Sequence, residues 1–321
     1  MFYGNKMRTK KIAITIGDPA GIGTEIALKA IFAEEIAGIC KPVIVGDKAV
    51  IEEAIDKLGI PHSIKDLELI DAGSIKDRNF QKNRPTAEGG KACVSYIKKA
   101  VELALNKSVD AVVTAPISKE ALKMAGFKWP GHTEMLAELT NTKDFAMMFY
   151  SDKLKVILVT IHTALKNVPK MIKKEKVLKT IMLAKKSSDM LDIKNPRIAV
   201  SGLNPHAGES GIFGDEEIRE IIPAVDEAQS MGISVSGPYP ADALFHKAYN
   251  GEFDIIVCMY HDQGLAPFKM IAFEKGVNMT VGLPIIRTSP DHGTAYDIAW
   301  KGIANPSSII EAIKLAARVK I

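Results

Sequence analysis

Short apolar runs recur along the chain and alternate with longer amphipathic stretches. Runs rich in β-branched residues lie at 12–16, 43–45, 111–115, 156–161, 198–201 and 255–260. Most of them are followed by turn residues and then by a helical pattern, such as TEIALKAIFAEEI after the first run. Apolar strands that alternate with helices are typical of parallel sheets covered on both faces. The pattern therefore predicts an α/β fold, with mainly parallel sheets in α/β/α layers.

The length of 321 residues favours two such lobes with a cleft between them, where substrates commonly bind. The clearest breaks are the segments 126–134 and 282–293, both dense in Gly and Pro. They predict a first lobe formed by 1–128 together with 286–321, and a second lobe formed by 129–285. No internal repeat is present, which argues against a solenoid.

Composition narrows the class of protein. No apolar run approaches the ~18 residues of a membrane span, and the N-terminus lacks a signal-peptide pattern, so we expect a cytoplasmic protein. Cys40, Cys93 and Cys258 are too few and too dispersed for a disulfide framework, and we expect them to be reduced and mostly buried. A balance of 42 basic to 38 acidic residues argues against nucleic-acid binding but suits a small anionic substrate.

Two charged or glycine-rich segments have ordinary structural explanations. The lysine cluster at 170–186 follows a helical pattern, which favours a solvated helix face. The motif GDPAGIG at 17–23 lacks the spacing of a dinucleotide fingerprint, and a tight strand-to-helix turn competes with a ligand loop that would use Asp18 and backbone N–H groups. Walker, HExxH and CxxC motifs are absent.

Three histidines follow apolar strands. His162 comes after VILVTI, His206 after IAVSGLNP and His261 after IIVCMY. The carboxyl ends of strands form the edge where open α/β sheets bind ligands. Three imidazoles gathered there would suit zinc or a similar divalent ion. The alternative is three structural histidines, because spacings of 44 and 55 residues carry no local metal signature.

Other candidates for anion binding lie in similar loops. His132 and Thr133 precede the helical MLAELT and could hold a phosphate at a helix start, whereas helix capping by Thr133 is the alternative. Lys269 and Arg287 lie in apolar surroundings, so each needs a partner, either an internal acid or an anionic substrate. Asn278 in GVNMT more often closes a turn than contacts a ligand.

Long blocks of the chain resemble one known family. They are GDPAGIGTE (17–25), PGHTE (130–134), TIHTAL (160–165), SGLNPHAGESGIFGDEE (201–217), GPYPAD (237–242), MYHDQG (259–264) and GVNMTVGLPIIRTSPDHGTAYDIAWKG (276–302). From about residue 11 to the end, the chain resembles the 4-hydroxythreonine-4-phosphate dehydrogenases of vitamin B6 biosynthesis. It departs from them at Thr24, where the family usually has proline. Proline suits a first helical position and threonine suits a cap, so we expect the helix start to be preserved. The first residues fall outside the pattern, and Met7 competes with Met1 as the start.

The resemblance implies a set of site residues. It places the metal on His162, His206 and His261. It places substrate contacts on His132, Thr133, Lys269, Asn278 and Arg287. The segment 291–306 is similar to the adenosine-binding segment of isocitrate and isopropylmalate dehydrogenases, whose fold the family shares, so His292 and Asn305 are the expected cofactor contacts. The resemblance also implies a homodimer with its active site at the interface, so the imidazoles need not come from one chain. The first lobe would carry the cofactor, and the second the metal, the substrate and the dimer interface.

The implied reaction is the oxidation and decarboxylation of 4-phosphohydroxy-L-threonine to 3-amino-2-oxopropyl phosphate, with NAD or NADP and one zinc, magnesium or cobalt ion. The ion would lower the pKa of the substrate alcohol as hydride leaves. Lys269 would donate a proton or pair with an anionic group, and Asp262 and Asp242 would orient an imidazole or serve as helix caps.

Other functions stay open. Members of the same family oxidise 4-phospho-D-threonate, 4-phospho-D-erythronate or a dihydrodiol. A metal-dependent phosphatase would use the same histidines on a bound water. A sugar-phosphate-binding module would use them only for packing. No sequence motif of the chain distinguishes zinc from magnesium or cobalt, or NAD from NADP.

Overall fold

The computed structural model describes residues 8–320, so both candidate start residues, Met1 and Met7, lie outside the described part. The described chain forms two compact units. Unit 1 comprises 8–141 and 284–318, and unit 2 comprises 142–283 and 319–320. The predicted cleft between lobes, and the assignment of cofactor and metal to different lobes, stay predictions.

Unit 1 is built on parallel strands. Their spatial order is β3 (Leu69–Asp71), β2 (Cys40–Gly46), β1 (Lys10–Thr15), β4 (Ala111–Thr114) and β11 (Arg287–Pro290). The central strands are almost entirely buried, as expected for a sheet with both faces covered. The last strand comes from the far end of the chain, which ties the two chain segments of this unit together.

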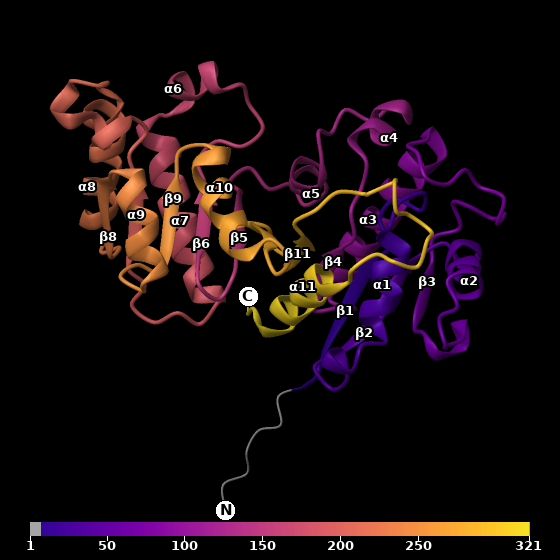
Figure 1. Ribbon diagram of the computed structural model, residues 1–321. Helices are drawn as coiled ribbons and strands as arrows, with labels where there is room; N and C mark the ends of the chain where they lie inside the picture. The colour runs from indigo at the N-terminus through magenta and orange to yellow at the C-terminus, as the bar shows by residue number, and fades with distance from the viewer. Residues whose placement is uncertain (1–7, 321) are drawn as a thin grey trace, which may run out of the picture. The chain divides into compact units, whose positions relative to one another are not determined.

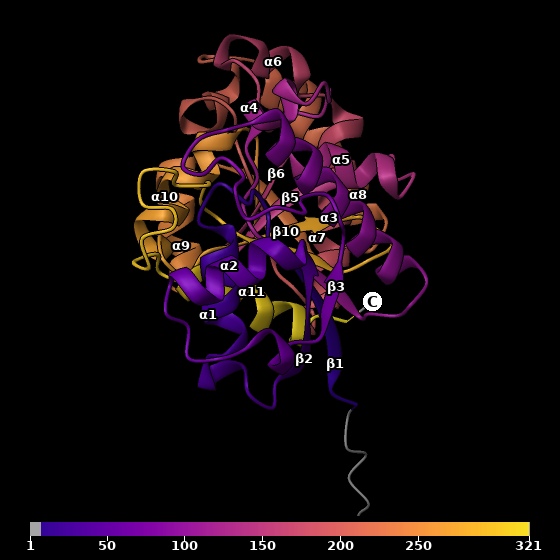
Figure 2. The ribbon, with the colours of Figure 1, turned by 90° about the vertical axis from the view of Figure 1, so that its right-hand side faces the viewer.

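The helices of unit 1 pack in two groups. One group is α3 (Ala87–Leu105), α4 (Lys119–Met124) and α5 (His132–Leu139); the other is α1 (Gly23–Ile31), α2 (Lys48–Lys57) and α11 (Ser307–Arg318). The C-terminal helix α11, drawn in yellow, packs on β1, β4 and β11 and lies beside the indigo helix α1 (Figures 1 and 2).

Unit 2 contains a mixed sheet. The strand order is β10 (Val277–Val281), β5 (Ala146–Tyr150), β6 (Lys155–Leu158), β9 (Ile255–Cys258), β7 (Ile198–Ser201) and β8 (Val235–Tyr239). The pairs β10–β5 and β5–β6 are antiparallel, whereas β6, β9, β7 and β8 run parallel.

Four helices of the described part of unit 2 pack against this sheet. They are α7 (Lys174–Met190), α8 (Ile222–Ser230), α9 (Ala241–Tyr249) and α10 (His261–Ala272), and a short helix, α6 (Val168–Met171), precedes α7. Helix α7 contacts β6, β7, β9 and β10, while α10 contacts β6 and β9. A buried cluster that includes Phe149 and Phe268, with ring centroids 5.8 Å apart, joins α10 to the strands.

The prediction of an α/β fold with mainly parallel sheets is confirmed, and each of the six predicted apolar runs contains a strand. Pattern analysis missed β3, β5, β8, β10 and β11. Strand β11 reads RTSP and is buried along its whole length, so polar residues concealed it. Asn278, expected near a turn, lies within β10.

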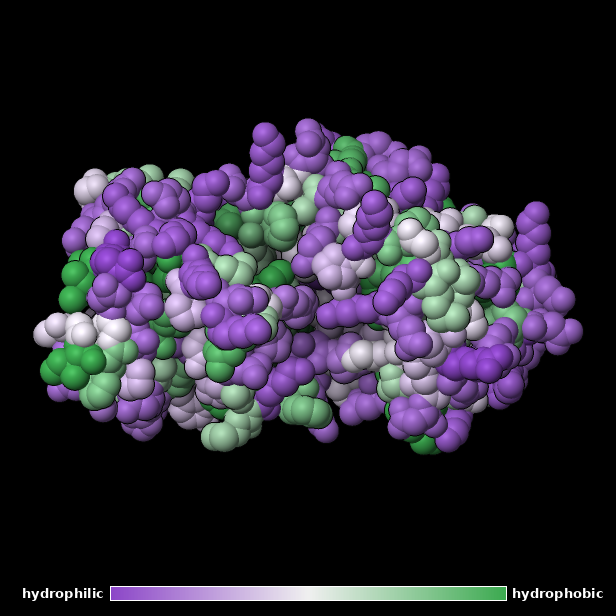
Figure 3. All heavy atoms as spheres, turned by 90° about the horizontal axis from the view of Figure 1, so that it is seen from above, coloured by the Kyte–Doolittle hydropathy of each residue, from purple (hydrophilic) through white to green (hydrophobic). Residues whose placement is uncertain are grey.

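The cysteine prediction is confirmed, since Cys40, Cys93 and Cys258 are free and buried. Between residues 8 and 320, no helix is long and apolar enough to cross a membrane. Hydrophilic side chains cover most of the face shown in Figure 3, with apolar side chains in scattered patches.

Candidate active site

The strands that precede the three candidate metal histidines are neighbours. Strand β9 lies between β6 and β7, and all three run in the same direction. Their carboxyl ends therefore meet at one edge of the unit 2 sheet. His162 and His206 lie in the loops after β6 and β7, and His261 is the first residue of α10, directly after β9.

Two of these imidazoles lie side by side. The ring centroids of His162 and His261 are 5.8 Å apart. The Nδ1 atom of His261 is 2.7 Å from Oδ1 of Asp262, which is a hydrogen bond. A carboxylate on one ring nitrogen fixes the orientation of the imidazole and directs its Nε2 atom to a ligand, an arrangement common among metal-binding histidines. Helix α10 has no side-chain cap, so Asp262 does not serve as one.

His206 lies on a loop with unusual backbone geometry. Its φ is 52°, and its ring is 6.0 Å from that of Phe213. Among the described residues, no group of three or more His, Cys, Asp or Glu side chains is arranged to hold a metal ion within one chain.

The donor chemistry nevertheless fits a divalent ion. Paired imidazoles are ligands that zinc, cobalt and similar ions accept. His162 and His261 supply such a pair, and Asp262 supplies the carboxylate that orients one of them.

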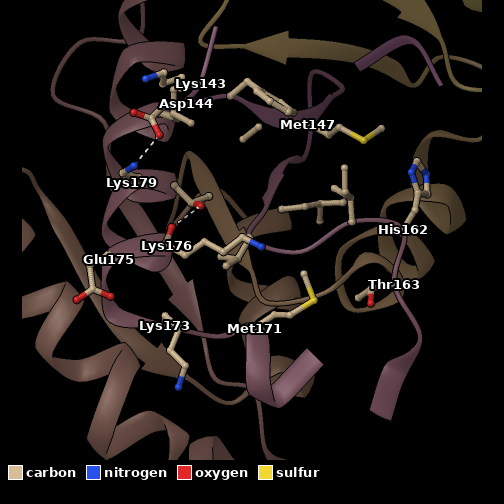
Figure 4. Close-up of a pocket in the computed structure, with 17 residues that line it drawn as sticks. Lys143, Asp144, Met147, His162, Thr163, Met171, Lys173, Glu175, Lys176 and Lys179 are labelled. Carbon is tan, nitrogen blue, oxygen red and sulfur yellow. Dashed lines mark hydrogen bonds and ion pairs between the residues drawn. The ribbon is translucent and has the colours of Figure 1, made fainter. Parts of the chain in front are cut away.

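A cavity of about 500 Å³ lies beside His162, between α7 and the strands β5 and β6 (Figure 4). Lys143, Lys173, Lys176 and Lys179 line it together with apolar side chains that include Met147. The side chain of Lys176 extends from α7 toward the middle of the cavity, and its burial lowers its pKa. The lysine cluster is therefore partly a cavity wall rather than only a solvated face. Asp144 and Glu175 also line the cavity, and Lys179 and Lys173 are paired with Asp144 and Glu220.

Unit 1 carries a separate anion-binding candidate around Arg287. This residue is 2% exposed, and its guanidinium donates to Oγ1 of Thr114 from Nη2 (2.7 Å) and Nε (3.1 Å). Burial lowers the pKa of Arg287 to about 9, which leaves it charged at neutral pH. Strand β11 presents Arg287 beside β4, where it pairs in register with Val112.

His132 starts helix α5 in the same unit. Burial, followed by the charge of Arg287, lowers its pKa well below the ordinary value, so the ring is neutral at physiological pH. Its enclosed Nε2 atom has no hydrogen-bond partner, and neither has Oε2 of Glu134 two residues further on. Buried polar atoms without partners are uncommon, and a ligand or a water molecule would satisfy them. Thr133 is buried inside α5, whose N-cap is Gly131, so Thr133 is not a cap.

In unit 2, Asn278 shows the same signature. It is 8% exposed, and its Oδ1 atom has no hydrogen-bond partner. Lys269 lies on α10 with its Nζ atom 5.9 Å from the centroid of the Phe273 ring. Asp242 is an exposed residue in the first turn of α9, which has no side-chain cap.

The glycine-rich motif after β1 forms a tight, internally satisfied turn. A Cβ atom on Gly23 would lie 2.1 Å from the Ile16 carbonyl oxygen, so only glycine fits there. Asp18 is buried and accepts hydrogen bonds from the Ala20 amide (2.9 Å) and the Tyr296 hydroxyl (2.7 Å). Burial raises the pKa of Asp18. Thr24 is the second residue of α1 rather than its cap, although the helix start itself is preserved.

The two expected cofactor residues lie in unit 1. His292 is exposed, with Nδ1 3.1 Å from the Gly293 carbonyl oxygen. The Oδ1 atom of Asn305 accepts from the Ser307 amide (2.9 Å) and hydroxyl (2.7 Å), which closes a turn just before α11.

Sequence patterns missed two members of these groups. Thr114 ends an apolar strand and carried no signal of its own. Glu134 was visible in GHTE, but a lone carboxylate in a first helical turn usually serves the helix dipole.

Comparison with solved structures places the chain among α/β dehydrogenases. It is similar to the crystal structure of 4-hydroxythreonine-4-phosphate dehydrogenase from Klebsiella pneumoniae, with 41% identity and a TM-score of 0.89 over 98% of this chain and 99% of that one.

The chain belongs to the PdxA family, whose model, described as pyridoxal phosphate biosynthetic protein PdxA, matches residues 38–316. Curated relatives carry two names. A 4-hydroxythreonine-4-phosphate dehydrogenase from Desulforapulum autotrophicum is 48% identical over 95% of this chain and 94% of the relative. A D-threonate 4-phosphate dehydrogenase from Salmonella typhimurium is 43% identical over 98% of this chain and 100% of the relative.

Proposed function

We propose that this protein is a metal-dependent, NAD(P)-dependent dehydrogenase that oxidises and decarboxylates 4-phosphohydroxy-L-threonine to 3-amino-2-oxopropyl phosphate. The observation that carries the proposal is the His162 and His261 pair with its Asp262 partner, at the carboxyl edge of β6 and β9 in a PdxA-family chain. We further propose that it works as a homodimer, which allows His206 of a second copy to complete the ligand set.

Each unit carries side chains suited to part of such a substrate. The charged guanidinium of Arg287 suits a phosphate or carboxylate group of the substrate. The Nε2 atom of the neutral His132 ring is available for a hydrogen bond to the same substrate. Asn278 offers a buried amide oxygen that can accept from an ammonium or hydroxyl group. Thr133 completes this substrate set in the proposal, and His292 and Asn305 are proposed for NAD(P).

The residues divide the reaction between them. His162 and His261 would hold the divalent ion, and the bound ion would lower the pKa of the secondary alcohol of the substrate. Asp262 accepts the N–H of His261 Nδ1 and keeps that ring in one orientation. Oxidation would release the hydroxyl proton to solvent and pass hydride from the same carbon to NAD(P), and the β-keto acid so formed would release carbon dioxide. Lys269 is proposed to donate the proton that replaces the lost carboxyl group on carbon. No role is derived for Asp242.

A second candidate function is the oxidation of 4-phospho-D-threonate or 4-phospho-D-erythronate. The relative of that name from Salmonella typhimurium spans nearly the whole chain. The same imidazoles and the same arginine would serve both substrates.

A substrate panel tests these alternatives. The protein is mixed with NAD or NADP, with zinc, magnesium or cobalt, and with each phosphorylated acid in turn, and absorbance of reduced nicotinamide is followed. We expect reduction with 4-phosphohydroxy-L-threonine that a chelator abolishes and that His261→Ala lacks. Reduction only with phosphothreonate or phosphoerythronate would favour the second candidate. Release of phosphate without nicotinamide reduction would indicate a phosphatase, and no reaction with any acid would indicate a binding module.

A further inference from the structure

The loop that carries His206 adopts a backbone conformation that L-residues rarely hold. The φ angles are 52° at His206, 52° at Ala207, 80° at Gly208, 41° at Glu209 and 57° at Ser210. A side chain on a left-handed residue approaches its own carbonyl oxygen, so only glycine visits this region freely. Four non-glycine residues in such a run persist only when the surroundings impose the conformation.

The buried carboxylate of Glu217 lies against this loop. Glu217 is 1% exposed. Its Oε1 atom accepts from the backbone amides of Leu203 (2.7 Å) and Asn204 (2.8 Å), and its Oε2 atom accepts from Nδ2 of Asn204 (2.9 Å). These bonds fix the residues that lead directly into His206.

The loop also closes tightly on this carboxylate. A Cβ atom on Gly208 would lie 2.8 Å from Oε2 of Glu217, and one on Gly202 would lie 3.1 Å from Oε1. Both glycines therefore let the backbone approach the carboxylate from either side of His206. Contacts at both ends leave the intervening residues little freedom.

The helix that presents Glu217 has a local irregularity with a clear cause. Residues Glu217–Ile221 form a π-helical turn before α8. Pro223 lies at the start of α8 and has no N–H for an ordinary helical bond, and a widened turn accommodates such a residue. Turns of this kind are frequent at functional sites.

We propose that Glu217 is a positioning residue that holds the His206 loop in its left-handed form, and that it affects metal binding and turnover only through His206. The inference rests on the proposed function, because it takes His206 as a metal ligand. It assigns a role to a carboxylate that touches neither metal nor substrate.

The test compares Glu217→Gln with Glu220→Gln. The two carboxylate oxygens of Glu217 accept three hydrogen bonds from the loop. In glutamine one of these oxygens is replaced by an NH₂ group, which cannot accept, so at least one bond to the loop is lost. Glu220 lies on the same turn but accepts from Lys173 Nζ (2.8 Å) and the Lys174 amide (2.9 Å), away from the loop. We expect Glu217→Gln to weaken cobalt binding, followed by the visible spectrum of the cobalt-loaded protein, and to lower kcat by roughly 10- to 100-fold. Glu220→Gln is expected to stay within twofold of wild type.

His206→Ala separates the possible failures. Cobalt binding unaffected by His206→Ala would overturn the ligand role of His206 and with it the proposed function. Weakened binding in His206→Ala, together with normal binding in Glu217→Gln, would overturn only the inference. In the double variant we expect no loss beyond that of His206→Ala alone, because both changes act through one ligand; additive losses would contradict the proposal. Should Glu217→Gln not fold, Asn204→Ala removes the side-chain bonds to Glu217 (2.9 Å) and Glu216 (2.8 Å) but keeps both backbone bonds to Glu217, and is expected to give a smaller loss of the same kind.

Discussion

Replacement of Arg287 by methionine gives the sharpest test of the anion-binding group in unit 1. Methionine has similar length and an apolar side chain, so it fills the buried position without the charge. Removing one partner of a buried, hydrogen-bonded charge pair costs about 2–5 kcal/mol. At about 1.4 kcal/mol per factor of ten, kcat/KM for the phosphorylated acid should fall by roughly 30- to 4000-fold.

The same substitution should change stability in the absence of substrate much less than it changes activity. It loses the two hydrogen bonds to Thr114 but also removes the cost of burying a charge, so the melting temperature without ligand should fall by a few degrees at most. This combination separates substrate binding from a purely structural role. A melting temperature that falls while KM remains within twofold of wild type would refute the reasoning.

Thr114→Val provides the companion measurement. It removes the hydroxyl that accepts from Nη2 and Nε of Arg287, while the charge remains. Hydrogen bonds to charged groups contribute about 1.5–3 kcal/mol. The loss in kcat/KM should therefore be smaller, roughly tenfold to a hundredfold. Both variants are assayed by steady-state reduction of nicotinamide over a range of substrate concentrations.

Two further predictions concern stability. Thr24→Val should raise the melting temperature by a few degrees. Thr24 is 1% exposed and its Oγ1 atom has no hydrogen-bond partner, and a buried unsatisfied hydroxyl costs about 1–3 kcal/mol. Thr288→Val deletes a hydrogen bond to the Ala312 carbonyl oxygen and should lower the melting temperature, so a shift in the same direction for both variants would contradict the argument. The lowered pKa of His132 means that the unfolded chain binds a proton below about pH 6.5 that the folded state refuses, so stability should fall as the solution is acidified below that value, by up to about 1.4 kcal/mol per pH unit. His132→Gln should flatten the slope of melting temperature against pH, and parallel slopes for variant and wild type would show that His132 is not the group responsible.

The sequence identified the parts of the fold whose residues are uniformly apolar. Strands such as 111–114 and 255–258 are covered on both faces, and their composition shows this directly. It did not reveal β11 or β10, where Arg287 and Asn278 lie, because a buried strand that carries polar side chains has the composition of a loop. The strands most relevant to a ligand were thus the least visible.

The sequence alone determined the α/β class, the six apolar runs that contain strands, the burial of the cysteines, and the histidines that follow three of those strands. Only the tertiary structure decided that those three strands are neighbours, that the His162 and His261 rings lie 5.8 Å apart, and that Glu217 accepts hydrogen bonds from residues just before His206. Local patterns depend on residues a few positions apart, whereas strand order and long-range hydrogen bonds join segments tens of residues apart. For that reason side-chain periodicity could indicate where each strand lies but not which strand lies beside it.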